Sequence, residues 1–191
     1  MSTDTNEKII AATQLWLERA VIGLNLCPFA REVHANKQIR YVVSSAAHPE
    51  DLLEELMNEL EVLAETPSET IDTTLLIHPY VLTDFLDQND FMGVVDEALD
   101  DMELDGILQV ASMHPLYQFA DTQPDDIENY TSRAPYPILQ LLREASIVKV
   151  VAAYPEAEQI FDNNIATLRR LGHAGWNELG LANLAATPEK K

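Results

Sequence analysis

Three short apolar segments, each closely followed by a His-Pro pair, constrain the fold of this chain most strongly. The segments are residues 39–45 (IRYVVSS), 73–78 (TTLLIH) and 107–114 (ILQVASMH), and the pairs are His48-Pro49, His78-Pro79 and His114-Pro115. Short segments rich in β-branched residues favour strands, and a proline cannot donate to a sheet, so each pair marks the end of a strand. Long helical patterns separate the segments, and such alternation is typical of parallel sheets with right-handed crossovers.

The segments between and around the strands predict helices. Residues 49–65 carry leucines at helical spacing, residues 80–104 form a second helical pattern that we expect to break near residues 89–93, and residues 5–24 form an N-terminal amphipathic helix. Two more helices are expected over residues 136–152 and 155–171, with Gly172 as the C-cap of the second.

These elements predict a single small α/β domain over residues 1–191. Its β-α-β-α-β core has about three mainly parallel strands, preceded by an N-terminal helix and followed by two C-terminal helices. Residues 1–5 and 183–191 are expected to be frayed tails. The alternative is an α+β two-layer sandwich with one antiparallel strand.

Charge is distributed unevenly along the chain. The formal net charge is −20, and residues 41–132 hold 22 of the 32 acidic residues but no lysine or arginine. Such a field repels phosphate backbones and anionic membranes, so we expect neither nucleic acid nor a membrane as a partner. One explanation for the excess of acidic residues is solubility, because most of these carboxylates lie on the polar faces of two helices. The other is that the acidic helices bind a basic protein partner or a divalent cation.

Targeting and motif signals are few. A single cysteine, and a start without a charged-then-apolar signal region, fit a cytoplasmic protein. The patterns GxGxxG, GxxxxGK[ST], HExxH and GxSxG are missing, so nucleotide-binding, zinc-protease and α/β-hydrolase functions lose their usual support.

His78 and His114 are the first candidate site residues. If their strands are parallel, both lie at the carboxyl edge of the sheet, where open α/β sheets bind ligands. Converging imidazoles suit acid/base catalysis or a divalent transition metal, the one cofactor that these residues suggest. The alternative is that each ring only binds a backbone group at a strand end. His48 lies beyond its strand and is expected to precede a helix with Pro49 in its first turn.

The long connection at residues 114–132 (HPLYQFADTQPDDIENYTS) is dense in polar and aromatic groups, and such loops in compact domains tend to be functional. Arg133 is the only basic residue in the range 41–142. Its guanidinium either pairs with a carboxylate of the loop or anchors an anionic ligand. The candidate substrate contacts are Tyr117, Asp121, Asp126, Asn129, Tyr130, Arg133 and Arg143.

Cys27 lies in the segment NLCPFAR that follows the first helix. Pro28 at a first helical position would make Cys27 the N-cap of a short helix ending near His34, which would lower the pKa of its thiol and favour a nucleophilic thiolate. The alternative is a buried cysteine that only fills apolar space. Whether Cys27 comes near His78 and His114 stays open.

Three segments, residues 25–30 (NLCPFA), 114–121 (HPLYQFAD) and 129–144 (NYTSRAPYPILQLLRE), carry a family resemblance. Together they resemble an uncharacterised bacterial family catalogued as domain of unknown function 1415, over most of the chain. The resemblance implies a bacterial, cytoplasmic protein and brings no established activity, cofactor or catalytic residue.

These observations favour a small-molecule enzyme with its site at the carboxyl edge of the sheet. His78 and His114 would act as acid/base groups or metal ligands, Arg133 would orient a small anionic substrate, and Cys27 would be a nucleophile or a further ligand. The alternatives are a metal- or ligand-binding protein without turnover, and an interaction module that uses its acidic helices.

Overall fold

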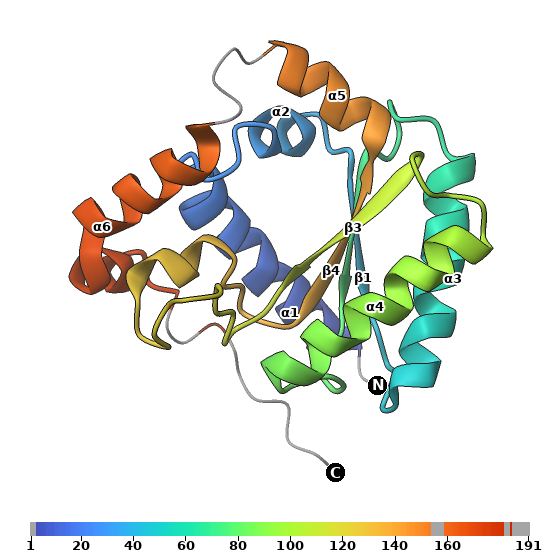
Figure 1. The fold of residues 1–191 in the computed structure, drawn as a ribbon, viewed down its shortest axis with the longest axis horizontal. Helices are drawn as coiled ribbons and strands as arrows, with labels where there is room; N and C mark the ends of the chain where they lie inside the picture. The colour runs from blue at the N-terminus through green and yellow to red at the C-terminus, as the bar shows by residue number, and fades with distance from the viewer. Residues whose placement is uncertain (1–2, 154–158, 182–183, 185–191) are drawn as a thin grey trace.

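The computed structural model of the chain describes residues 3–153, 159–181 and 184. A four-stranded sheet lies between two layers of helices (Figure 1). In chain order the elements are α1 (Thr3–Trp16), the π-helix η1 (Leu17–Ile22), α2 (Ala30–Ala35), β1 (Ile39–Val43), α3 (Pro49–Glu65), β2 (Thr73–Ile77), α4 (Phe85–Asp101), β3 (Leu108–Met113), the 3-10 helix η2 (Ile127–Thr131), β4 (Ile138–Arg143), α5 (Glu144–Ala153) and α6 (Ile160–Glu178).

The mixed sheet confirms the α/β fold: three of its strands share one direction, and the fourth runs against them. Its strand order is β1-β2-β4-β3. β1 and β2 pair in parallel, and β4 runs antiparallel to both β2 and β3, so the three predicted strands all run in the same direction. Ile138 at the start of β4 pairs with Ile77 on one side and Met113 on the other, so β2 and β3 end level at one edge of the sheet.

The central antiparallel strand β4 was not predicted. The expected helix over residues 136–152 is wrong in its first half, where residues 138–143 (ILQLLR) form β4, and only residues 144–153 are helical. A short apolar segment fits a buried strand and a buried helix equally well by its pattern. Residues 138–143 form a strand because their backbone N–H and C=O groups pair with β2 on one side and β3 on the other.

Two other helices differ from the prediction. α4 starts at Phe85, after Asp84 accepts a hydrogen bond from the backbone N–H of Leu86 (2.8 Å), and it continues without a break to Asp101. Phe91 within the expected break and Val95 just after it are buried and hold the helix against the sheet. In α6 the predicted C-cap, Gly172, does leave helical geometry with φ +64°, but helical residues resume directly after it.

The predicted end regions are described only in part. Residues 3–5 belong to α1, and the expected fraying of residues 1–5 stays a prediction. The expected tail at residues 183–191 lies, apart from Leu184, outside the described residues. Within the described part, no helix is long and apolar enough to cross a membrane.

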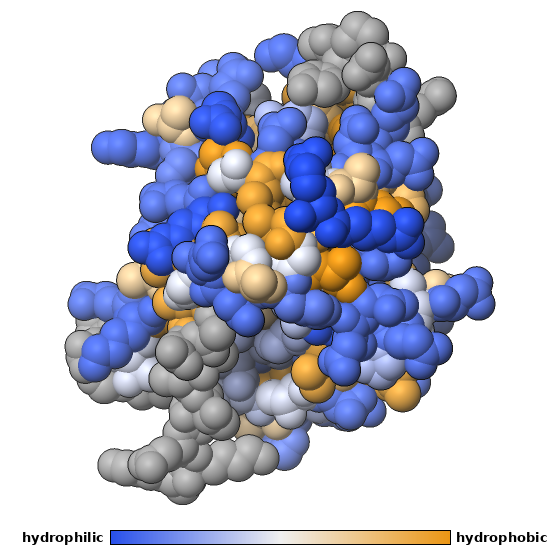
Figure 2. All heavy atoms as spheres, turned by 90° about the vertical axis from the view of Figure 1, so that its left-hand side faces the viewer, coloured by the Kyte–Doolittle hydropathy of each residue, from blue (hydrophilic) through white to orange (hydrophobic). Residues whose placement is uncertain are grey.

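Each face of the sheet has its own apolar core. On one face α3 and α4 pack through Leu52, Leu56, Leu60 and Val95 onto residues such as Leu139. On the other face α1, η1 and α6 pack through Trp16, Leu17 and Leu168 onto residues such as Ile77. On the side where α6 lies, hydrophobic side chains show through the mostly hydrophilic surface (Figure 2).

The acidic residues of α3 and α4 point mostly outward, as predicted. Asp51, Glu61, Asp87 and Asp96, for example, are exposed. Glu59 is the exception at 9 % exposure, and its carboxylate binds the Arg40 guanidinium of β1 through two hydrogen bonds of 2.7 and 3.0 Å. The outer surface of this layer is therefore strongly negative.

Candidate functional site

His78 and His114 lie at the same edge of the sheet, each directly after its strand. Their backbone N–H groups donate to the carbonyls of Pro137 (3.0 Å) and Ser132 (3.2 Å), so the segment that enters β4 runs between them. Both side chains are fully buried, with exposures of 0 and 1 %. The Phe85 ring of α4 lies 5.8 Å from the His114 ring, which places this imidazole on the α4 side of the sheet.

The hydrogen bonds of the two rings fix different tautomers. The Nδ1 of His78 lies 3.0 Å from the Val81 carbonyl, which can only accept, so Nδ1 carries the hydrogen and Nε2 keeps a lone pair. The Nδ1 of His114 accepts from the Leu116 N–H (3.0 Å), so the neutral ring carries its hydrogen on Nε2. Because only one of these Nε2 atoms offers a lone pair, the two neutral rings do not both bind one metal ion through Nε2.

No other groups complete a metal site there. In the part of the chain that the structure describes, no group of three or more His, Cys, Asp or Glu side chains is placed to hold a metal ion. Both Nε2 atoms are buried, and neither has a hydrogen-bond partner among the described residues.

Burial keeps both imidazoles neutral at pH 7. Burial is the main cause that lowers the pKa of His78 to about 4, and the nearby His114 acts in the same direction. The hydrogen bond to the Val81 carbonyl acts in the opposite direction. Burial also lowers the pKa of His114, although the carbonyls of Leu82 and Thr83 oppose this effect. The two rings are near enough for His114 to affect the pKa of His78, and both are enclosed by protein.

The connection after β3 is organised by its own hydrogen bonds, with Asn129 at its centre. This side chain is fully buried. Its Oδ1 accepts from the Phe119 N–H (3.0 Å) and the Thr122 hydroxyl (2.8 Å), and its Nδ2 donates to the Gln123 carbonyl (2.8 Å). All of its polar groups are thus used within the loop.

Arg133 also binds the loop itself, through carbonyls and not through a carboxylate. Its Nε donates to the Tyr117 carbonyl (3.1 Å) and its Nη2 to the Pro124 carbonyl. The guanidinium carbon lies 4.5 Å from the centre of the Tyr130 ring, in a cation–π contact. Its neighbours therefore account for Arg133 without a bound anion.

Of the remaining candidates in the loop, the two tyrosines pack against other aromatic rings and the two aspartates do not. Tyr117 packs between Phe85 and Phe119, each 5.0 Å away, and Tyr130 packs on Trp176 (4.9 Å). Asp126 accepts from the Gln123 N–H (2.7 Å), and Asp121 is exposed with φ +64°. These contacts stabilise the loop.

Arg143 lies at the end of β4, not on a helix. Its Nε donates to the Ile71 carbonyl (3.2 Å), and its Nη2 donates to the carbonyls of Leu63 (2.6 Å) and Thr66. It therefore caps the C-terminal end of α3 with a positive charge, which is the favourable sign there.

A cavity of about 360 Å³ lies on the other face of the sheet. Helices α1, α2 and α5, with η1, surround it, and its floor is formed by residues of β2, β3 and β4 such as Leu75, Ala111 and Leu142. Most of the wall is apolar, with Trp16, Leu17, Val21 and Phe29 among its residues. The floor residues Gln109, Ala111, Gln140 and Leu142 are only half-buried although helices cover this face, so the space is not filled by side chains.

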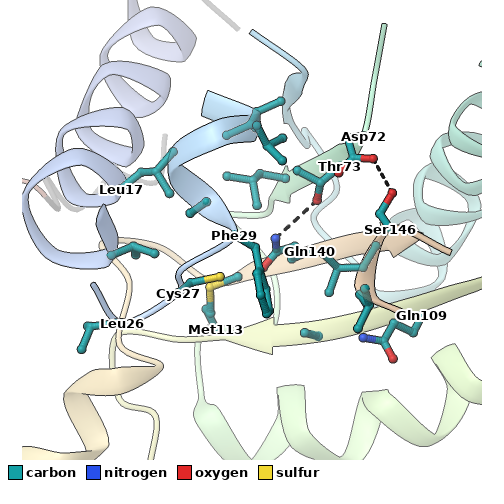
Figure 3. Close-up of a pocket in the computed structure, with 18 of the residues that line it drawn as sticks. Leu17, Leu26, Cys27, Phe29, Asp72, Thr73, Gln109, Met113, Gln140 and Ser146 are labelled. Carbon is teal, nitrogen blue, oxygen red and sulfur yellow. Dashed lines mark hydrogen bonds between the residues drawn. The ribbon is translucent and has the colours of Figure 1, made fainter. Parts of the chain in front are cut away.

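Polar groups gather at one end of the cavity (Figure 3). The Ser146 hydroxyl donates to the Asp72 carboxylate (2.5 Å). The Thr73 hydroxyl donates to the Leu141 carbonyl (2.7 Å) and accepts from the Gln140 amide (3.3 Å). Gln109 lies near this end, and Leu17, Leu26 and Cys27 lie toward the other (Figure 3).

Cys27 lines this cavity and lies apart from the histidines, which do not line it. The N-cap prediction is wrong, because α2 begins at Ala30 and its N-cap is Phe29. The backbone N–H groups of Phe29 and Ala30 do favour a thiolate, but burial outweighs them and raises the pKa of the Cys27 thiol. Cys27 is therefore a neutral thiol at pH 7, not an activated nucleophile.

The comparison with known families agrees with the resemblance seen in the sequence. A family model described as "Protein of unknown function (DUF1415)" matches residues 8–178. The chain belongs to this family. No curated protein and no solved structure matches it. For this DUF1415 member the geometry of the site therefore carries the functional argument.

Sequence reasoning missed the polar end of the cavity. Thr73, Gln109 and Gln140 come from three strands and line the same side of the sheet, and Gln109 and Gln140 each lie between two apolar residues of their strand. Inward-facing polar residues in strands are the signal that could have located it. That signal needs the register of β4, which was predicted as a helix.

Proposed function

We propose that this protein binds a small molecule in the cavity between the sheet and helices α1, α2 and α5. The observation that carries the proposal is a space of about 360 Å³ with apolar walls and polar groups at one end. Ligand sites in proteins are typically concave, mostly apolar and about 300–1,000 Å³ in volume, with a few placed polar groups.

The local backbone supports this choice. Leu17 and Val21, which line the cavity, come from the π-helix η1. π-Helical turns are rare and occur frequently at functional sites, because they displace side chains from regular helical positions. The proposal favours the ligand-binding hypothesis over an enzyme built on His78 and His114.

A neutral fluorescent probe, N-phenyl-1-naphthylamine, tests the proposal. We expect it to bind with enhanced fluorescence, and we expect Ala111→Phe, which places a ring in the cavity, to weaken binding at least tenfold. Ala166→Phe makes the same change at an exposed position of α6 and should bind like the original chain. Ala111→Leu is a smaller filling variant in case the phenylalanine disturbs folding, which thermal unfolding will show. Equal binding by the folded Ala111 variants and the original chain would contradict the proposal.

An enzyme that uses His78 and His114 is the second candidate. The observation in its favour is that both Nε2 atoms are buried without a partner in the described part of the chain. A substrate would reach them only if the segment over the rings moved, and Leu82 in that segment has a strained φ of +52°. Elemental analysis of protein purified without a histidine tag tests the metal-dependent form. Near-stoichiometric metal that is lost in both His78→Ala and His114→Ala would favour this candidate and contradict the tautomers assigned above.

A further inference from the structure

We propose that the ligand of the cavity carries a cationic hydrogen-bond donor, such as an ammonium group, on an apolar body. This inference rests on the proposed function, because it names the class of molecule that the cavity binds. It departs from the anionic substrate expected from the sequence.

The hydroxyl groups at the polar end present lone pairs and not hydrogens. The single hydrogen of the Thr73 hydroxyl is donated to the Leu141 carbonyl, and that of the Ser146 hydroxyl is donated to Asp72. A hydroxyl has one donor and two acceptor sites, so both groups have only acceptor capacity left for a ligand. A ligand that binds them must therefore donate.

The Asp72 carboxylate favours a cation, whereas the positive charge of Arg143 is engaged with backbone carbonyls. Asp72 and Arg143 are the charged side chains among the described residues that line the cavity. Arg143 directs Nε and Nη2 at carbonyls near the end of α3. One oxygen of Asp72 accepts from Ser146, and a carboxylate has further acceptor sites. The Asp72 carboxylate, beside two hydroxyls whose hydrogens are already donated, is a site for an ammonium group.

The rest of the molecule is consistent with a cationic ligand that has an apolar body. Leu17 provides apolar wall away from Asp72 (Figure 3), and Trp16 and Phe29 are further apolar residues of the lining. The formal net charge of −20 raises the local concentration of small cations at the protein surface. An amine with an alkyl or aromatic body meets both conditions.

Three probes of equal chain length test the head group: octylamine, 1-octanol and octanoate, each displacing N-phenyl-1-naphthylamine at pH 7. We expect octylamine to bind at least tenfold more tightly than 1-octanol, and octanoate to bind most weakly. Asp72→Asn should reduce octylamine binding to the level of 1-octanol and leave 1-octanol unchanged. Glu69→Gln removes an exposed carboxylate close by in the sequence that does not line the cavity, and it should change nothing.

The outcomes separate this inference from the proposed function. If the fluorescent probe binds but octylamine binds no better than 1-octanol or octanoate, the head-group inference is wrong and the cavity remains a ligand site. If Asp72→Asn keeps the preference for octylamine, the net charge and not Asp72 causes it, and the inference is also wrong. Repeating the titrations at about 1 M salt, where the Debye length falls to about 3 Å, removes the general field.

Discussion

Replacing Asn129 tests whether the loop after β3 is held together by this one buried amide. In Asn129→Ala the Phe119 N–H and the Gln123 carbonyl lose the partners that lie 3.0 and 2.8 Å away. An unsatisfied buried polar group costs about 1–3 kcal/mol, and water can replace the partner of the exposed Gln123, so we expect a loss of about 1–3 kcal/mol in the free energy of unfolding. Urea denaturation measures the loss, and hydrogen exchange shows whether residues 114–132 lose protection.

A matched control and a second readout make the result decisive. Asn163→Ala removes an exposed amide from α6 and should stay within about 0.5 kcal/mol of the original chain. An Asn129→Ala protein with unchanged stability and unchanged protection of the loop would refute the structural role. If it also bound the fluorescent probe less tightly, Asn129 would be a ligand contact, as predicted from the sequence.

Three further predictions follow from buried or capping groups. Burial lowers the pKa of His78 to about 4, from about 6.5 in the unfolded chain, so the unfolded state binds more protons between these two pH values. The free energy of unfolding should therefore fall by about 3 kcal/mol from this group as the pH drops from about 6.5 toward 4. His78→Gln should flatten this pH dependence in urea titrations across the same range. Burial raises the pKa of the Cys27 thiol, so its alkylation by iodoacetamide should have a pH midpoint above about 8.5, and a lower midpoint would show an activated thiolate. Arg143→Met leaves the carbonyls of Leu63, Thr66 and Ile71 without their donor and should cost about 2–4 kcal/mol in urea denaturation, whereas a loss below about 0.5 kcal/mol would contradict the capping role.

The elements with strong local signals were predictable from the sequence. α3 spans Pro49–Glu65 as predicted, because its leucines keep helical spacing and Pro49 suits a first helical turn. β1, β2 and β3 lie within the predicted segments, and the shared edge of His78 and His114 follows from their parallel direction. Each of these inferences depends on residues close together in the chain.

The features that failed depend on contacts between distant residues. β4 is a strand because β2 and β3 offer backbone partners on both sides, which the segment ILQLLR cannot reveal. The expected partner of Arg133 was a carboxylate or an anion, but the fold of the loop brings the Tyr117 and Pro124 carbonyls to it. The sequence predicted a low pKa for Cys27 from a helix expected to start next to it. The burial that raises this pKa could not be predicted, because it depends on residues distant in the chain.

The cavity itself could not be located from the sequence for the same reason. Its wall combines Trp16 and Cys27 from the N-terminal part with Asp72, Gln109 and Ser146, which lie far along the chain. Only the register of β4 and the position of α5 bring these residues together. The cavity lies on one face of the sheet, whereas the sequence predicted a site at the edge of the sheet.

A crystal structure of the protein with octylamine tests the central claim most directly. We predict density for the ligand in the cavity, with its nitrogen within hydrogen-bond distance of the Asp72 carboxylate and its alkyl chain against Trp16 and Leu142. Density at the surface only, or an empty cavity at a concentration that saturates binding in solution, would contradict the claim that this cavity is the ligand site.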